Sequence, residues 1–137
     1  MLYEVSSKRV VIDKKGNDKI AIEHFIVDNA TLFGEAETAV LMLHNLENDV
    51  VAVKRSNIEA VINTREDDEQ KLYIATIEKT MFEDVKEIVT RERVAMFAMN
   101  IEDATDRAKE YMSTDMADCV LVGVKKSKFA DLVGYLD

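Results

Sequence analysis

The residues best suited to chemistry in this sequence lie in two basic turns that resemble each other. Residues 51–62 and 122–133 both follow the pattern V-x-V-K-[KR]-S-x-[IF]-x-x-[VL]-[IV], and the two copies lie 71 positions apart. Each copy reads as a short apolar strand, two adjacent cations, a serine and an apolar helical turn. A strand that leads two cations into a helix N-terminus offers positive charge and free amides to an anion such as phosphate. The predicted ligand-binding residues are therefore Lys54, Arg55, Ser56, Lys125, Lys126, Ser127 and Lys128.

The serines of these turns have a second interpretation as helix caps. Ser56 and Glu59 have the spacing of a capping box, in which the hydroxyl and the carboxylate satisfy the first free amides of a helix. Glu59 would then occupy the positive end that a phosphate needs. The second copy has Ala130 at this position, so it is the stronger candidate for binding an anion.

Other kinds of reactive site are not indicated. His24 and His44 have no second ligand at a metal-binding spacing such as H-x-x-x-H or C-x-x-C, so no metal or cofactor is predicted. Cys119 is the single cysteine and has apolar neighbours, which favours a buried thiol in a reducing compartment. No serine lies in a G-x-S-x-G elbow. The sequence therefore predicts no catalytic residues and a non-enzymatic protein.

Charge and hydropathy narrow the choice of partners. With 27 acidic and 18 basic residues the formal charge is −9, which opposes binding to nucleic acid or to an anionic membrane. No apolar run approaches the roughly 18 residues that span a bilayer, and no signal-peptide pattern opens the chain, so a cytoplasmic location is expected. The acidic run at residues 66–69 is typical of a solvated linker, but it would also suit binding to a basic surface of another protein.

Hydrophobic patterning predicts the elements that position the first basic turn. Two strands are expected at residues 2–12 and 20–27, the second because apolar residues there recur with a period of two. The polar residues 6–9 of the first would mark a bend or an edge. The helix that follows should bury one stripe, formed by Ala36, Ala39, Val40 and Leu43. A third strand is expected at residues 50–53 and a short helical turn at residues 60–62. The turn with its two cations would thus connect a strand to a helix.

The same pattern restarts after a polar connector at residues 63–71. Leu72 and Tyr73 match the opening Leu2 and Tyr3 at an offset of 70 residues, and the helix starts and basic turns match at offsets of 68 and 71. The predicted elements are strands at residues 72–81 and 88–99, a helix capped by Asn100, and a strand at residues 119–124. The helix should bury one stripe, formed by Ile101, Ala104, Ala108, Tyr111 and Met112. The three offsets of 68, 70 and 71 residues differ by no more than small changes in loop length would cause, so they indicate an internal duplication.

These elements define the predicted fold class. It is α+β, a tandem duplication of a β-β-α-β unit with pseudo-twofold symmetry, in which helices pack on one face of a mainly antiparallel sheet. The chain is expected to form a single domain, residues 1–137, made of two repeats, residues 2–62 and 72–133, with the connector 63–71 between them. The strands before and after each helix should be parallel to each other. One six-stranded sheet and two three-stranded sheets both fit this pattern.

Several of these stretches resemble a known family. They are the opening Leu2-Tyr3 strand, a return strand that ends with residues 25–30, the helix start at residues 35–37 and the turn at residues 53–56. They are similar to those of a family of short bacterial and phage proteins known only as a domain of unknown function. The resemblance covers nearly the whole chain. It implies a cytoplasmic protein of bacterial or phage origin, and it brings no assigned activity or site.

Two functions fit these features. The first prediction is a non-enzymatic protein that binds a small ligand, a nucleotide or another phosphorylated metabolite, near the two basic turns. The alternative is an acidic protein-interaction module, or a phage-type inhibitor of a host protein. Either function is compatible with a homo-oligomer, and neither requires a metal, a cofactor, nucleic acid or a membrane.

Overall fold

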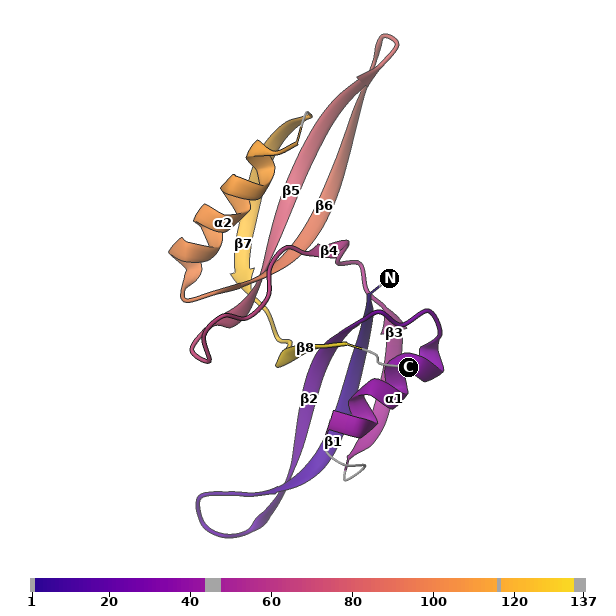
Figure 1. The fold of residues 1–137 in the computed structure, drawn as a ribbon, viewed down its shortest axis with the longest axis vertical. Helices are drawn as coiled ribbons and strands as arrows, with labels where there is room; N and C mark the ends of the chain where they lie inside the picture. Colours follow the sequence, from indigo (N-terminus) through magenta and orange to yellow (C-terminus); the bar gives the residue numbers. More distant parts are fainter. Residues whose placement is uncertain (1, 44–47, 116, 135–137) are drawn as a thin grey trace. The chain divides into compact units, whose positions relative to one another are not determined.

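A computed structural model describes residues 2–43, 48–115 and 117–134 of the protein. Within these ranges the chain forms two helices and eight strands, and the strands make two four-stranded sheets (Figure 1). The chain divides into two compact units, Met1–Asn57 with Lys128–Asp137, and Ile58–Ser127. The predicted α+β class is therefore confirmed, but neither of the two expected sheet arrangements is right.

The first unit contains one sheet and one helix. Its elements are β1 (Tyr3–Ile12), β2 (Asp18–Asp28), α1 (Phe33–Leu43), β3 (Asp49–Arg55) and β8 (Asp131–Gly134). The strand order is β3-β1-β2-β8. Because β1 is antiparallel to both β2 and β3, the strands before and after α1 are parallel to each other, as predicted. β8 pairs with the other edge of β2 in parallel.

The second unit also contains one sheet and one helix. Its elements are β4 (Ala60–Val61), β5 (Lys71–Glu83), β6 (Lys86–Ala98), α2 (Ile101–Ser113) and β7 (Asp118–Lys126). The strand order is β4-β6-β5-β7. β5 is antiparallel to both β6 and β7, and β4 pairs with the free edge of β6 in parallel.

Each unit has a core between its helix and one face of its sheet. Side chains alternate between the two faces of a strand, so every second apolar residue reaches the helix. In the first unit the buried residues are Tyr3, Val5, Phe25, Val27, Ala30, Ala36, Ala39 and Val40. In the second unit they are Tyr73, Ala75, Ile77, Val94, Met96, Ala98, Ala104 and Ala108. The helices contribute mainly alanines, which allow them to lie close to the sheet.

The predicted buried stripes of the helices are confirmed for their central residues. Ala36 and Val40 in α1, and Ala104 and Ala108 in α2, have an exposed fraction of 0%. The prediction is wrong for Leu43, which is 45% exposed, and for Ile101, which is 51% exposed. The buried residues of α1 end at Val40, one turn before the helix itself ends, so the last turn lies beyond the core.

The start of α2 is fixed by side chains, as predicted. Asn100 is the N-cap, and its Oδ1 accepts a hydrogen bond from the Asp103 amide at 2.8 Å. In return Asp103 Oδ2 accepts one from the Met99 amide at 2.9 Å. This reciprocal pair satisfies two backbone donors around the helix N-terminus and so defines where the helix begins.

The largest difference from the predicted fold concerns the segments after the two basic turns. A helical turn is predicted at residues 60–62, but β4 forms there and pairs with β6. The Glu59 amide donates to the Arg93 carbonyl at 2.8 Å, and the Ile62 amide donates to the Ala95 carbonyl at 3.0 Å. After the second turn the chain likewise forms a strand, β8. The reason is that β2 and β6 would otherwise be open edges, whose backbone groups need partners.

The closing strands also change how the chain divides. β4 follows β3 in the chain but lies in the second sheet, and β8 follows β7 but lies in the first. The compact units therefore differ from the predicted repeats, residues 2–62 and 72–133, by these two segments. The predicted connector, residues 63–71, also belongs to the second unit, where Asn63 Nδ2 donates to the Phe97 carbonyl at 2.8 Å. The single domain over residues 1–137 stays a prediction.

Candidate functional site

The first basic turn lies at the end of β3. Lys54 stands opposite Glu4 of β1, and its Nζ lies 3.8 Å from Glu4 Oε1. The Ser56 hydroxyl donates to Glu4 Oε2 at 2.9 Å, and the Ser56 amide donates to the Leu2 carbonyl at 3.0 Å. Both polar groups of Ser56 therefore bind within the first sheet, and Glu4 offsets the charge of Lys54. Arg55 is exposed at the end of the strand.

The second basic turn lies at the end of β7 and has different surroundings. Lys125 stands opposite Ile74 of β5, so an apolar residue takes the place that Glu4 has in the first turn. Lys125 and Lys126 are exposed. The Ser127 amide donates to the Leu72 carbonyl at 2.9 Å. This turn has no carboxylate in the cross-strand position and keeps more of its positive charge.

Lys128 follows the second turn and begins the segment that leads to β8. It is exposed, and its Nζ lies 5.6 Å from the centroid of the buried Phe129 ring, which is the geometry of a cation–π contact. The structure assigns Lys128 to the first unit together with residues 54–56, whereas residues 125–127 belong to the second.

The predicted mechanism of anion binding is wrong for both turns. A strand and not a helix follows each serine, so neither turn leads into a helix N-terminus with free amides. The capping box of Ser56 and Glu59 is wrong for the same reason. The exposed side chains of Arg55, Lys125, Lys126 and Lys128 remain as cations that could hold an anion. Ligand binding by the seven predicted residues stays a prediction.

A cluster of charged residues that sequence reasoning missed lies between α2 and the second sheet. Lys79 of β5 makes ion pairs with Glu92 of β6 and, at 2.6 Å, with Asp115 Oδ2 after α2. The Tyr111 hydroxyl of α2 donates to Glu92 Oε1 at 2.7 Å. Glu92 is only 8% exposed. The cluster therefore ties the end of α2 to two neighbouring strands.

The protonation states in this cluster are those of a structural contact. Hydrogen bonds to Asp115 and then to Glu92 raise the pKa of Lys79. The hydrogen bond to Glu92, with a contribution from burial, raises the pKa of Tyr111 to about 12. Burial raises the pKa of the nearby Cys119 thiol. At neutral pH the ammonium therefore stays charged, and the phenol and thiol stay protonated. None of the three is poised as a general base or a nucleophile.

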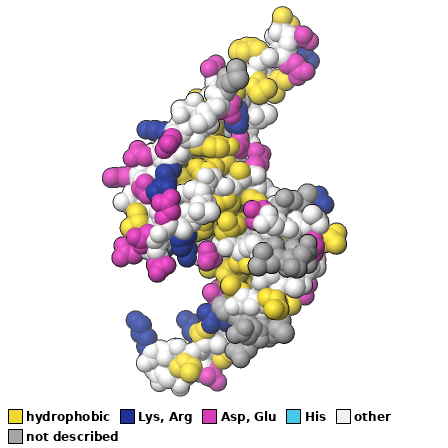
Figure 2. Space-filling view, viewed as in Figure 1, with side chains coloured by type: hydrophobic (Ala, Val, Ile, Leu, Met, Phe, Trp, Pro, Cys, Tyr) yellow, Lys and Arg dark blue, Asp and Glu magenta, His cyan; other side chains and the backbone are white. Residues whose placement is uncertain are grey.

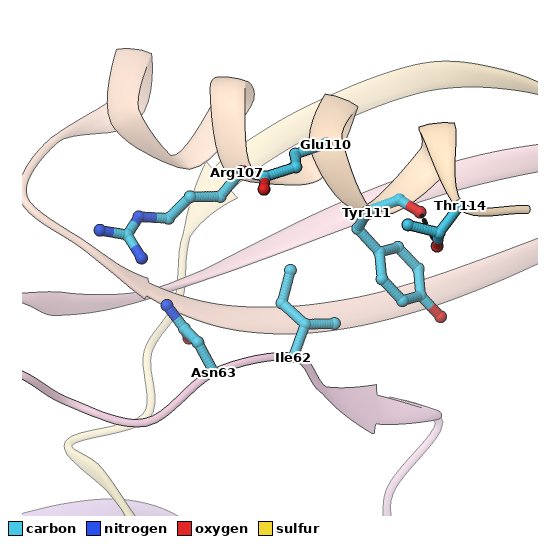
Figure 3. A pocket seen from close by; sticks show the side chains of 6 residues that line it. All are labelled: Ile62, Asn63, Arg107, Glu110, Tyr111 and Thr114. Carbon is cyan, nitrogen blue, oxygen red and sulfur yellow. Dashed lines mark hydrogen bonds between the residues drawn. The ribbon is translucent and has the colours of Figure 1, made fainter.

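A shallow pocket lies on the other side of Tyr111, between α2 and the segment after β4 (Figure 3). Its volume is about 280 Å³, just below the range of roughly 300–1,000 Å³ that is usual for small-molecule sites. Its lining residues are Ile62, Asn63, Arg107, Glu110, Tyr111 and Thr114. Arg107 is engaged with Asp103, whose Oδ1 lies 3.1 Å from Arg107 Nε. The pocket has room for a small group only, and its main cation already has a partner.

The remaining residues considered from the sequence are His24, Cys119 and His44. His24 Nδ1 lies 2.9 Å from the Ser6 hydroxyl oxygen, and Cys119 is half-buried rather than buried. His44 lies outside the described residues. In the described part of the chain no group of three or more His, Cys, Asp or Glu residues is arranged to hold a metal ion.

Neither α1 nor α2 is long and apolar enough to cross a membrane, and the described residues contain no other helix.

The raised pKa values predict a loss of stability at alkaline pH. An unfolded tyrosine loses its proton near pH 10.0, whereas folded Tyr111 does so near 12. The folded state holds this proton more tightly, so its contribution to stability is complete below about pH 10 and is lost as the pH rises to 12. Lys79 acts in the same direction. The free energy of unfolding measured in urea should therefore fall between about pH 10 and pH 12.

The alkaline decrease in the free energy of unfolding should be smaller in Tyr111→Phe, which lacks the titrating hydroxyl. Tyr73→Phe is the matched control, because Tyr73 lies in the same core without belonging to the cluster. Identical alkaline slopes in the two variants would show that the Tyr111 hydroxyl does not stabilise the fold through Glu92.

Comparisons with known proteins bear on the chain as a whole. No curated protein and no solved structure matches the sequence. One family model matches residues 1–135, nearly the full length. The resemblance to an uncharacterised family is thereby confirmed, while a bacterial or phage origin stays a prediction. The chain belongs to the family described as "Domain of unknown function (DUF4494)".

Proposed function

We propose that the protein is a non-enzymatic interaction module that binds other proteins through the distal halves of its two long hairpins. The first hairpin is β1–β2 and the second is β5–β6. The observation that carries the proposal is the exposure of large apolar side chains there. In the first hairpin Val10 is 65%, Ile12 74%, Ile20 64% and Ile22 62% exposed.

The register of the first hairpin gathers these side chains on one face. Val10 stands directly opposite Ile20, and Lys8 opposite Ile22. Because faces alternate along a strand, these residues lie on the face opposite Val5, which packs against α1. Monomeric soluble proteins rarely expose contiguous apolar patches without a function, so an apolar strip on a hairpin favours a protein partner.

The second hairpin exposes apolar residues on both faces. They are Met81 (54%), Phe82 (69%), Val85 (97%), Ile88 (37%) and Val89 (51%). Every residue from 81 to 91 is exposed. A phenylalanine and a valine at the tip are suited to insertion into an apolar site on a partner. An inhibitor of a host protein is the narrower form of this proposal.

The test removes the apolar strip without changing the strand. Val10→Thr/Ile20→Thr replaces two facing aliphatic side chains with another β-branched residue, so the hairpin should persist. We expect proteins captured by the wild type from a lysate of its source cells to be lost with this variant. Val120→Thr/Val122→Thr is the matched control, since these β7 residues are 61% and 47% exposed and lie outside both hairpins. Equal capture by both variants would contradict the proposal.

A phosphorylated small molecule is the second candidate partner. The exposed Lys125 and Lys126, opposite an apolar residue, favour the second basic turn for such a ligand. Lys125→Glu/Lys126→Glu should abolish stabilisation by a nucleotide or metabolite panel in a thermal shift assay, because charge-assisted contacts of about 1.5–3 kcal/mol each would be lost. Lys54→Glu/Arg55→Glu should weaken it less, because Glu4 already offsets Lys54. Binding that survives the first double change would eliminate this site.

We further propose that the chain is a tandem duplication with pseudo-twofold symmetry. The two sheets have the same strand order. In sequence along the sheet, the strands β3, β1, β2 and β8 correspond to β7, β5, β6 and β4. In both sheets the register shifts at one place, next to Val51 in β3 and next to Val122 in β7. Both are the first residue of the repeated motif. These correspondences support the duplication, and β4 and β8 would then be closing strands exchanged between the copies.

The exchange predicts how a half-length chain behaves. A fragment of residues 63–137 lacks β4, so the edge of β6 is open and the fragment's own residues 131–134 are free to pair with it in a second copy. We expect this fragment to form a dimer in sedimentation equilibrium. The control fragment, residues 58–127, keeps its own β4 and should be a monomer. A folded, monomeric fragment 63–137 would contradict the exchange.

A further inference from the structure

In this acidic protein the half of the first hairpin next to its loop carries a net positive charge. Residues 8–22 hold five of the 18 basic and two of the 27 acidic residues, a net charge of +3 in a chain of −9, so the remainder carries −12. Figure 2 shows dark blue side chains gathered over this hairpin, next to apolar ones. The cations are Lys8, Arg9, Lys14, Lys15 and Lys19. Of these, Arg9 is paired with Glu23, whose Oε1 lies 2.6 Å from Arg9 Nε. The hairpin thus combines a basic surface with the aliphatic strip.

The loop of the first hairpin holds two of these lysines in a defined conformation. Asp13 Oδ1 accepts hydrogen bonds from the Lys15 and Asn17 amides, both at 2.9 Å. The Asp13 amide donates to the Asn17 carbonyl at 2.9 Å, which closes the loop, and Gly16 supplies the positive φ of +80° that the turn needs. Lys14 and Lys15 are exposed on this ordered loop.

The tip of the second hairpin has the opposite charge. Residues 81–89 include three carboxylates, Glu83, Asp84 and Glu87, and one cation, Lys86, which gives −2. The first two carboxylates line a hollow of about 380 Å³ together with Val85 and Ile88. A second hollow of about 410 Å³ is lined by Met81, Phe82, Asp115 and Asp118 among others. Both hollows combine apolar and acidic side chains.

We infer that the first hairpin of one copy of this chain docks on the tip of the second hairpin of another copy. This inference rests on the proposed function and names the partner. The aliphatic strip would cover the apolar side chains of the tip, and Lys14 and Lys15 would meet its carboxylates. Each chain carries both complementary surfaces, so the contact is heterologous and joins copies head to tail into rings or open chains.

A second copy suits these surfaces better than a nucleic acid does. The strip consists of aliphatic side chains, whereas single strands are bound by stacking on aromatic rings. The rest of the chain, at −12, repels a polyanion but leaves a short-range contact between two small hairpins unaffected. The two surfaces proposed to meet, residues 8–22 and 81–89, have 15 and 9 residues, fewer than the roughly 20–30 a side of a standard interface. Association should therefore be weak, reversible and sensitive to salt.

The experiment measures the mass of the purified full-length protein by sedimentation equilibrium over a wide range of concentration. The wild type should gain mass as its concentration rises, and added salt should reduce this gain. Lys14→Glu/Lys15→Glu should weaken self-association at least about tenfold, and Glu83→Lys/Glu87→Lys should do the same, because each places like charges across the contact. Lys71→Glu/Lys109→Glu is the control, since both residues are exposed and it makes the same charge change away from the loop of the first hairpin and the tip of the second.

Mixing the two hairpin variants provides the decisive arm. In the mixture the acidic first hairpin of Lys14→Glu/Lys15→Glu can bind the basic second hairpin of Glu83→Lys/Glu87→Lys. The two hairpins left unchanged, one in each variant, can also bind each other as in the wild type. The two variants should therefore associate with each other, although neither associates with itself. A wild type that stays monomeric, a mixture that fails to associate, or a control variant that loses mass equally would overturn the inference.

Two further results would assign the hairpin surfaces to a different partner. In the first result the wild type is monomeric and binds a labelled DNA or RNA, duplex or single strand, and Lys14→Glu/Lys15→Glu loses this binding. That result would assign the basic hairpin to nucleic acid and overturn the inference. A monomeric wild type that still captures proteins through Val10 and Ile20 would overturn the second copy as the partner while leaving the proposed interaction function in place.

Discussion

The free edges of β2 and β6 are the constraint on which the rest of the structure depends. Each of these strands has one long neighbour and needs a second partner for its other row of backbone groups. β4 and β8 meet this need with strands of only two and four residues. Because the chain must reach these edges directly after each basic turn, the segments behind Ser56 and Ser127 are extended. The same pairing that completes the sheets therefore removes the helix N-termini on which an anion site would depend.

A second constraint is the difference in length between helices and strands. A helix rises 1.5 Å and a strand about 3.3 Å per residue. α2 has 13 residues, and β5 and β6 also have 13 each. The helix thus spans about 20 Å while the strands it covers span about 43 Å. One helix cannot cover such a hairpin, so the distal half stays open on both faces. Apolar residues there have no core to join within the described part of their own unit, and this favours a role in contacts with other molecules.

The sequence predicts those features that depend on neighbours along the chain. A period of two locates both hairpins, and the spacing of Ala104 and Ala108 and the cap at Asn100 locate α2. The features it misses depend on pairing over long distances. A two-residue apolar stretch such as Ala60-Val61 has no periodicity of its own, so only the open edge of β6 determines that it is a strand. Likewise Glu4 meets Lys54, and Lys79 meets Glu92, only once the register is known.

Charge shows the same dependence on the fold. The net charge of −9 determines the electric field that the protein exerts on a distant ion. In 0.1 M salt, however, this field is largely screened beyond about 10 Å. A partner in contact meets only the charges within this distance. Around the loop of the first hairpin these are mainly lysines, and around Asp84 they are mainly carboxylates. The hairpins bring together residues that are close in sequence, so local order along the chain, rather than the total charge, determines which surfaces attract each other.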